Sequence, residues 1–119
     1  VWSYDIGTGY GGWGNQELQS YEEANVDVED GLLKITARRT GDGFTSGRIK
    51  TEDKVIFQYG TVEASIQTPN VDAGLWPAFW TLGENFGDVG WPKSGEIDIM
   101  EIGQGSAIPL GTVNRRVIG

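Results

Sequence analysis

The sequence predicts an all-β protein, and its glycine content and its alternating segments carry that prediction. The 119 residues include 19 glycines and few runs that favour helices, which is typical of short strands joined by many turns. Several segments also alternate apolar and polar residues with a period of two, as strands with one buried face do. We therefore expect residues 1–119 to belong to a single domain built from sheets.

The predicted strands follow one another between turn signals. In the first, Leu33, Ile35 and Ala37 alternate with polar residues and are expected to face inward. The preceding Glu29-Asp30-Gly31 is typical of a hairpin turn. The strands are expected at 32–38, 44–51, 57–68, 75–82, 96–102 and 113–118.

The stretch Glu96–Ile102 is the most informative part of the chain, because it threads three carboxylates through aliphatic residues. A regular strand would place Glu96 and Asp98 on one face and the intervening isoleucines on the other. Glu101 would then share the apolar face, where an unpaired carboxylate is very unfavourable. A β-bulge at Met100 would turn Glu101 back to the side of the other two acids. The sequence thus predicts a row of three acids on one exposed face.

Such a row has a specific chemical use. Carboxylates this close do not all ionise at their usual pKa, so one proton is retained at neutral pH and the row holds an acid and a base. In glycoside hydrolysis two carboxyl groups take these roles. The Cα atoms of Glu96 and Glu101 would lie about 13 Å apart. If the two side chains lean toward each other, their carboxyl groups come closer by several ångströms. Their separation is then nearer to the roughly 5–5.5 Å of retaining enzymes than to the wider separation of inverting enzymes.

Two other interpretations of the acidic strand are a Ca²⁺ site and a solvated acidic face. Calcium does prefer clustered oxygen ligands. A linear row on one strand, however, lacks a loop that could wrap about six to eight ligands around an ion. Catalysis is therefore the favoured interpretation.

The motif Glu-Ile-Asp-Ile-Met-Glu at 96–101 resembles the active-site signature of glycoside hydrolase family 16, in the bulged form typical of its endo-β-1,3-glucanases, the laminarinases. Residues 11–19 also resemble a loop-to-strand segment of that family. The resemblance implies that Glu96 is the nucleophile, Glu101 the general acid/base and Asp98 the residue that tunes the pair. It also implies a curved two-sheet β-sandwich, a concanavalin-like jelly roll.

The same resemblance implies four substrate-binding residues, namely Asn25, Arg48, Trp76 and Trp80. A period of two puts both tryptophans on one face with Ala78 between them, which would form a shelf for sugar rings. An arginine offers a rigid fork of donors to sugar hydroxyls. Core packing for the tryptophans, a structural role for the asparagine and a solvated arginine remain the alternatives.

Composition excludes several kinds of chemistry. The chain has no cysteine and no histidine, which removes disulfides, thiol catalysis, Ser-His-Asp hydrolysis and most zinc sites. A net charge of −8 argues against nucleic acid or an anionic membrane as a partner. We find neither a membrane span nor a signal peptide in the sequence. The family resemblance implies an extracellular protein whose chemistry needs no cofactor, with a structural Ca²⁺ in some members.

The expected function is retaining endo-hydrolysis of β-glucan, foremost at β-1,3 linkages. The alternatives are a non-catalytic β-glucan-recognition module and a hydrolase of mixed-linkage glucan or galactan. A jelly roll needs roughly twice the six or seven strands predicted here. The resemblance thus implies that residues 1–119 are the N-terminal portion of a catalytic domain. The C-terminal portion would belong to a longer form of the same chain or to a second chain. We expect the isolated piece to lack turnover.

Overall fold

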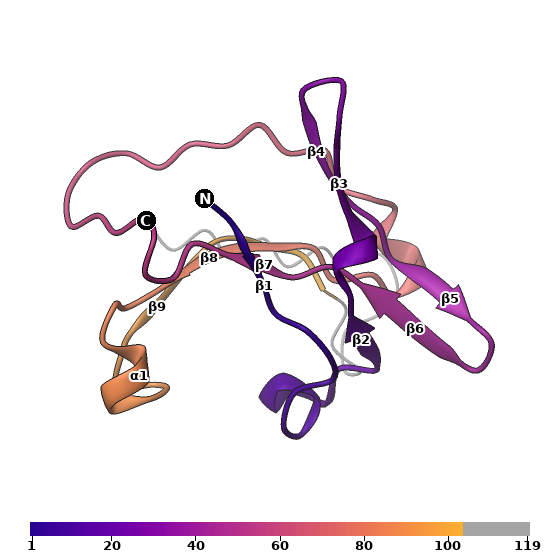
Figure 1. The fold of residues 1–119 in the computed structure, drawn as a ribbon, viewed down its shortest axis with the longest axis horizontal. Helices are drawn as coiled ribbons and strands as arrows, with labels where there is room; N and C mark the ends of the chain where they lie inside the picture. Colours follow the sequence, from indigo (N-terminus) through magenta and orange to yellow (C-terminus); the bar gives the residue numbers. More distant parts are fainter. Residues whose placement is uncertain (104–119) are drawn as a thin grey trace. The chain divides into compact units, whose positions relative to one another are not determined.

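The computed structural model describes residues 1–103, and its regular structure is almost entirely β (Figure 1). The strands are β1 Ser3–Tyr4, β2 Gln19–Tyr21, β3 Val26–Glu29, β4 Leu32–Ile35, β5 Arg38–Thr40, β6 Gly43–Ser46, β7 Ile49–Lys50, β8 Ala78–Leu82 and β9 Glu96–Glu101. The helical turns are η1 Gly12–Gln16, η2 Glu23–Asn25, η3 Val71–Ala73 and α1 Phe86–Val89. The predicted all-β class is confirmed, while the strand predicted at 113–118 lies outside the described residues.

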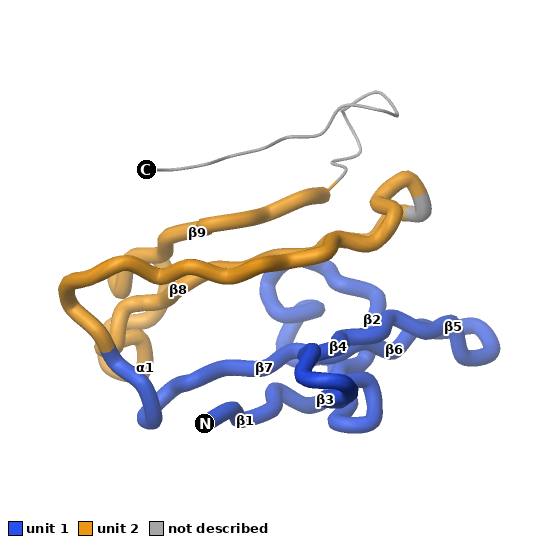
Figure 2. The backbone as a smooth tube through the Cα atoms, turned by 90° about the horizontal axis from the view of Figure 1, so that it is seen from above, with its two compact units in different colours: residues 1–56 blue, residues 57–119 orange. Residues whose placement is uncertain are grey.

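The chain divides into two compact units, residues 1–56 and residues 57–119 (Figure 2). The first unit contains β1 to β7, arranged as the pairs β1–β7 and β3–β4 and the three-stranded sheet β2-β6-β5. The described part of the second unit contains the antiparallel pair β8–β9 and the helix α1. The acidic strand thus belongs to the second unit.

The β3–β4 hairpin turns at Asp30 and Gly31, which both adopt left-handed backbone angles with φ of 53° and 76°. Two positive φ values match the twist of the flanking strands, so the predicted hairpin turn is confirmed. The prediction that Leu33 and Ile35 face inward is wrong for the described residues, since their side chains are 46% and 48% exposed. Ala37 is also exposed, because β4 ends before it and no described residue covers this face fully.

The single strand predicted at 44–51 is instead two strands with different partners. β6 lies between β2, which runs parallel to it, and β5, which is antiparallel, whereas β7 pairs with β1. The break falls at Gly47, where an added Cβ would come within 2.4 Å of a Val26 methyl group. The neighbouring Arg48 carbonyl accepts a 3.0 Å hydrogen bond from the Asp5 amide. The chain therefore passes from one sheet to another at Gly47.

Residues 57–68, predicted as a strand, form none in the structure. Their apolar and polar side chains alternate, but no segment among residues 1–103 pairs with them. A strand exists only where its backbone groups find ladder partners, so alternation alone did not suffice. The described residues likewise contain no buried hydrophobic side chain.

Asn25 is the most deeply buried polar side chain of the described residues, with 2% of its surface exposed. Its amide nitrogen donates to the Thr36 carbonyl at 2.6 Å and to the Thr45 hydroxyl at 3.1 Å. Its backbone carbonyl accepts from the Thr36 amide at 2.8 Å. The side chain thereby joins η2, β6 and the end of β4 within the first unit.

Replacing Asn25 by alanine is expected to lower the free energy of unfolding by about 1–3 kcal/mol, because the buried Thr45 hydroxyl and the Thr36 carbonyl both lose their donor. Urea denaturation followed by circular dichroism measures the change. The control is Asn15→Ala, which removes an exposed side chain that bonds only the nearby Glu17 carboxylate and should change stability by less than about 0.5 kcal/mol. Equal stability of Asn25→Ala and the wild type would contradict the anchoring role.

Candidate active site

The pair β8–β9 carries three acids on one face. The register opposes Glu96 to Leu82, Asp98 to Trp80 and Glu101 to Ala78. These three β8 residues are spaced two apart, and directly opposite residues of an antiparallel pair share a face. The predicted acid row (Glu96, Asp98 and Glu101) is therefore confirmed as a structural feature.

A β-bulge in β9 produces this arrangement. Asp98 opposes Trp80 and Met100 opposes Phe79, so Ile99 between them has no partner on β8. The sequence placed the extra residue at Met100, and the structure corrects its position by one residue. Either position restores the parity of the strand, because the two-to-one count of a bulge matters more than which residue is extra.

Trp80 lies on the face of the acid row, as predicted, directly opposite Asp98. Its side chain is half-buried. Trp76 precedes β8, which begins at Ala78 just after Pro77. The strand predicted at 75–82 therefore begins three residues later than expected, because the nitrogen of Pro77 has no hydrogen to donate to a ladder.

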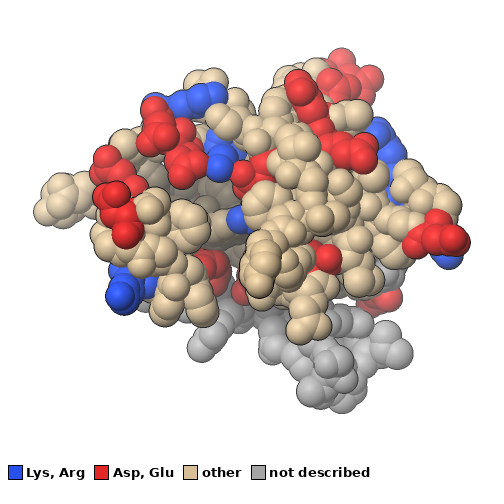
Figure 3. Space-filling model, turned by 60° about the horizontal axis from the view of Figure 1, so that its bottom comes forward, with Lys and Arg blue, Asp and Glu red and all other residues tan. Residues whose placement is uncertain are grey.

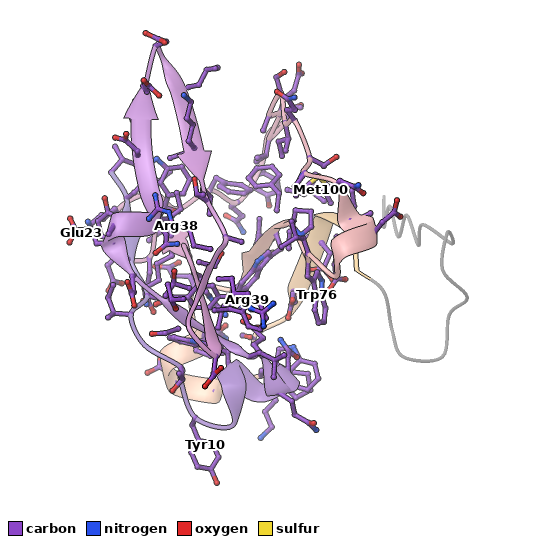
Figure 4. All side chains as sticks on the ribbon, turned by 90° about the vertical axis from the view of Figure 1, so that its right-hand side faces the viewer. Tyr10, Glu23, Arg38, Arg39, Trp76 and Met100 are labelled. Atoms are coloured by element: carbon purple, nitrogen blue, oxygen red, sulfur yellow. The ribbon has the colours of Figure 1, made fainter. Side chains whose placement is uncertain are left out.

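Each glutamate of the acid row accepts a hydrogen bond from an indole N–H. Trp76 Nε1 donates to Glu101 Oε1 over 3.1 Å, and Figure 4 shows the Trp76 side chain beside the β8–β9 pair. Trp91 Nε1 donates to Glu96 Oε2 over 2.8 Å. The sequence did not identify Trp91 as a partner of Glu96. A tryptophan in the loop that leads back into the acidic strand was the only available signal.

The electrostatics of the row act most strongly on Glu96. Partial burial raises the pKa of its carboxyl above the ordinary value, and the charge of Asp98 adds to the effect. A hydrogen bond with Asp98 and the charge of Glu101 act in the same direction. The Trp91 hydrogen bond opposes them and lowers the pKa. The pKa of Glu96 is thus set by burial, by two neighbouring acids and by one indole donor.

The other two predicted site residues lie in the first unit. Arg48 Nε forms a 2.9 Å ion pair with Asp5, and its guanidinium stands 4.7 Å from the centroid of the Trp13 ring. A cation over an aromatic face is an attractive arrangement. The side chain is 24% exposed, so it is held within the unit by several contacts, and the fully solvated alternative does not describe it. Asn25 is held by the buried hydrogen bonds described above.

Trp13, whose ring contacts Arg48, also contacts Gly7 and Tyr21 in the first unit. Its indole donates to the Gly7 carbonyl at 3.3 Å, and its ring lies 5.8 Å from that of Tyr21. Burial and a hydrogen bond to Glu17 raise the pKa of Tyr21 to about 12. These contacts fix the loop before β2.

Charged side chains of the described residues do not form a basic patch on the face shown in Figure 3, where lysines and arginines are interspersed with acids. Within residues 1–103, no three acidic side chains converge in a way that could hold a metal ion. Over the same residues, no helix has the length and apolar character needed to cross a membrane.

The bulged strand presents Glu, Asp and Glu on one face, and glycoside hydrolases use a pair of such carboxyl groups. Residues 7–97 match the family model described as beta-glucan synthesis-associated protein SKN1/KRE6/Sbg1. The beta-glucanase of Rhodothermus marinus is 41% identical, over 97% of this chain and 42% of its own length. The chain belongs to glycoside hydrolase family 16, in its laminarinase group.

Solved structures support the same assignment. A family 16 endo-glucanase from Bacteroides ovatus matches with a TM-score of 0.77 and 47% identity, over 86% of this chain and 43% of that one. A laminarinase from Flavobacterium sp. UMI-01 matches with a TM-score of 0.72 and 43% identity, over 86% and 45%. The predicted jelly-roll class is confirmed for the part of the domain covered. The chain spans less than half the length of these relatives.

Replacing Asp98 by asparagine is expected to lower the pKa of Glu96, because a charge and a hydrogen bond that both raise it are changed. Glu96 would then stay ionised to lower pH than in the wild type. Titration of ¹³C-labelled glutamate carboxyls by NMR measures the midpoint. Glu63→Gln, which removes an exposed carboxylate outside the β8–β9 pair, is the control and should leave it unchanged. An unaltered or higher midpoint in Asp98→Asn would contradict this account.

Proposed function

We propose that the protein containing this chain is a retaining endo-hydrolase of β-glucan that cleaves β-1,3-glucosidic bonds. The observation that carries the proposal is the bulged strand β9, which brings Glu96, Asp98 and Glu101 to one face. Two carboxyl groups close together on one surface are the machinery of a double-displacement reaction. The relatives include a beta-glucanase and a laminarinase, which supports the same substrate class.

In the first step, an oxygen of Glu96 would attack the anomeric carbon while Glu101 gives its proton to the departing glycosidic oxygen. The bond from the anomeric carbon to that oxygen breaks, and an ester to Glu96 forms. In the second step, Glu101 takes a proton from water, whose oxygen displaces Glu96 with the original configuration restored. Asp98 would tune the pair through its charge and its hydrogen bond with Glu96.

The substrate would contact aromatic rings and hydrogen-bonding groups. Trp80 shares the face of the acid row, and Trp76 is 53% exposed, so both rings are proposed to stack on sugars. Arg48 and Asn25 are proposed to bond sugar hydroxyls. The amide nitrogen of Asn25 already has two acceptors. Its Oδ1 has no hydrogen-bond partner among the described residues but is buried, so a sugar would bond it only if the residues around it moved to expose it.

The surroundings of the reaction follow from the same proposal. The substrate is a neutral polysaccharide, which the net charge of −8 permits. We propose an extracellular location, chemistry without a cofactor, and completion of the domain by a C-terminal portion in the same or a second chain. A structural Ca²⁺ would belong to the complete domain, and we assign no described residue to it.

Glu96→Gln is expected to lower kcat/KM for laminarin by at least about a thousandfold, since an amide cannot act as the nucleophile. Glu101→Gln should be similarly impaired. The assay is reducing-sugar release from laminarin, lichenan and agarose by a complete family domain that contains this sequence. Laminarin should be the preferred substrate.

The matched control is Glu63→Gln, which removes a carboxylate of the same unit outside the β8–β9 pair and should retain wild-type rates. Undiminished hydrolysis by Glu96→Gln would refute the nucleophile assignment. Binding of laminarin without any hydrolysis by the wild type would favour the glucan-recognition module instead.

A further inference from the structure

Resting on the proposed function, we infer that Trp91 is a positioning residue for the nucleophile, holding one oxygen of the Glu96 carboxylate through its indole N–H. Trp76 holds Glu101 in the corresponding way. The two catalytic glutamates of the row are thus each bonded by a tryptophan from outside strand β9.

The geometry of the Trp91 contact is that of a good hydrogen bond. Nε1 and Oε2 are 2.8 Å apart, within the range for an N–H donor to a carboxylate oxygen. An indole nitrogen donates and never accepts, so the bond favours the ionised carboxylate over the protonated one. It occupies Oε2, so Oε1 is the oxygen of Glu96 that Trp91 leaves available for attack.

Burial does not explain the position of Trp91, because its side chain is 68% exposed. Large rings are normally placed by packing into a core. The Trp91 side chain instead donates a hydrogen bond to Glu96. The position of the ring therefore points to the carboxylate that it bonds.

The loop that carries Trp91 is closed at its base by its backbone. The Gly83 amide donates to the Gly95 carbonyl at 3.2 Å, and the Ser94 amide donates to the Gly90 carbonyl at 3.0 Å. A Cβ on Gly83 would lie 2.0 Å from the Ser94 carbonyl oxygen, so only glycine permits this approach. The closed base fixes where Trp91 meets the start of β9.

Glu96 needs such a donor because the groups around it are acids. Asp98 and Glu101 face it from its own strand. The facing residues of β8 are alanine, tryptophan and leucine, none of which titrates. The Trp91 hydrogen bond favours the charged form of Glu96, and a carboxylate must be charged to attack as a nucleophile.

Backbone contacts hold the Trp76 ring beside Glu101. A Cβ on Gly103 would lie 3.2 Å from three atoms of the Trp76 ring, so the Gly103 backbone lies close against the indole. The Ile102 amide donates to the Pro77 carbonyl at 3.0 Å, which ties the two segments together. The indole N–H is thereby kept directed at Glu101.

The test replaces Trp91 by β-(3-benzothienyl)alanine, which keeps the ring shape and exchanges the N–H for sulfur. Trp91→Phe is the genetically encoded counterpart, and the same replacement at Trp2 in the first unit is the control. The readout is the ¹³C NMR titration of Glu96 in a complete family domain that contains this sequence. We expect the midpoint to move to higher pH in both Trp91 variants and to stay at the wild-type value in the Trp2 variant.

The second readout is the pH dependence of kcat/KM, measured with a complete family domain that contains this sequence. The acid limb of the kcat/KM profile should move to higher pH in the Trp91 variants, with rates roughly three- to tenfold lower on the acid side. The plateau at higher pH should stay near the wild-type value. A purely structural defect would instead lower kcat/KM equally at all pH values.

The two proposals fail separately. A Glu96 midpoint that is the same in the benzothienyl variant and in the wild type would overturn the role of Trp91, whatever the activity. A wild-type domain that does not hydrolyse β-glucan at any pH would overturn the proposed function, while the shift in the Glu96 titration would still establish the contact.

Discussion

One unpaired residue in β9 determines the direction of Glu101. Without the bulge at Ile99, period-two geometry would place Glu101 on the face opposite Glu96 and Asp98. An isolated carboxylate and a separate pair could not share a proton or approach one glycosidic bond. With the bulge, three acids and the ring of Trp80 share one face. The proposed chemistry depends on this local irregularity of the strand.

The bulge brings three acids together, and their mutual repulsion alone would disfavour an ionised nucleophile. Burial and two neighbouring acids raise the pKa of Glu96, which favours the protonated form of the residue that should be the nucleophile. Two indole donors, which carry no formal charge, bond the two glutamates. The Trp91 donor favours the ionised form of Glu96 without neutralising the row.

The sequence predicted correctly those features that depend on a few neighbouring residues. The Asp30-Gly31 turn and the acid row follow from turn chemistry and strand parity. Residues 57–68 alternate equally well but have no pairing segment among the described residues. The exposure of Leu33 has the same origin, because the layer that covers a strand is not encoded in that strand. The Trp91 contact was missed because a loop's return path leaves no periodic signal.

The central claim is that the bulged strand supplies the nucleophile of a retaining reaction. A 2-deoxy-2-fluoro laminari-oligosaccharide with a dinitrophenolate leaving group slows the second displacement and traps the covalent intermediate. Incubated with a complete family domain that contains this sequence and followed by peptide mass spectrometry, it should label Glu96. A label on Glu101, or hydrolysis of natural β-glucan by a domain that never acquires the label, would contradict the account.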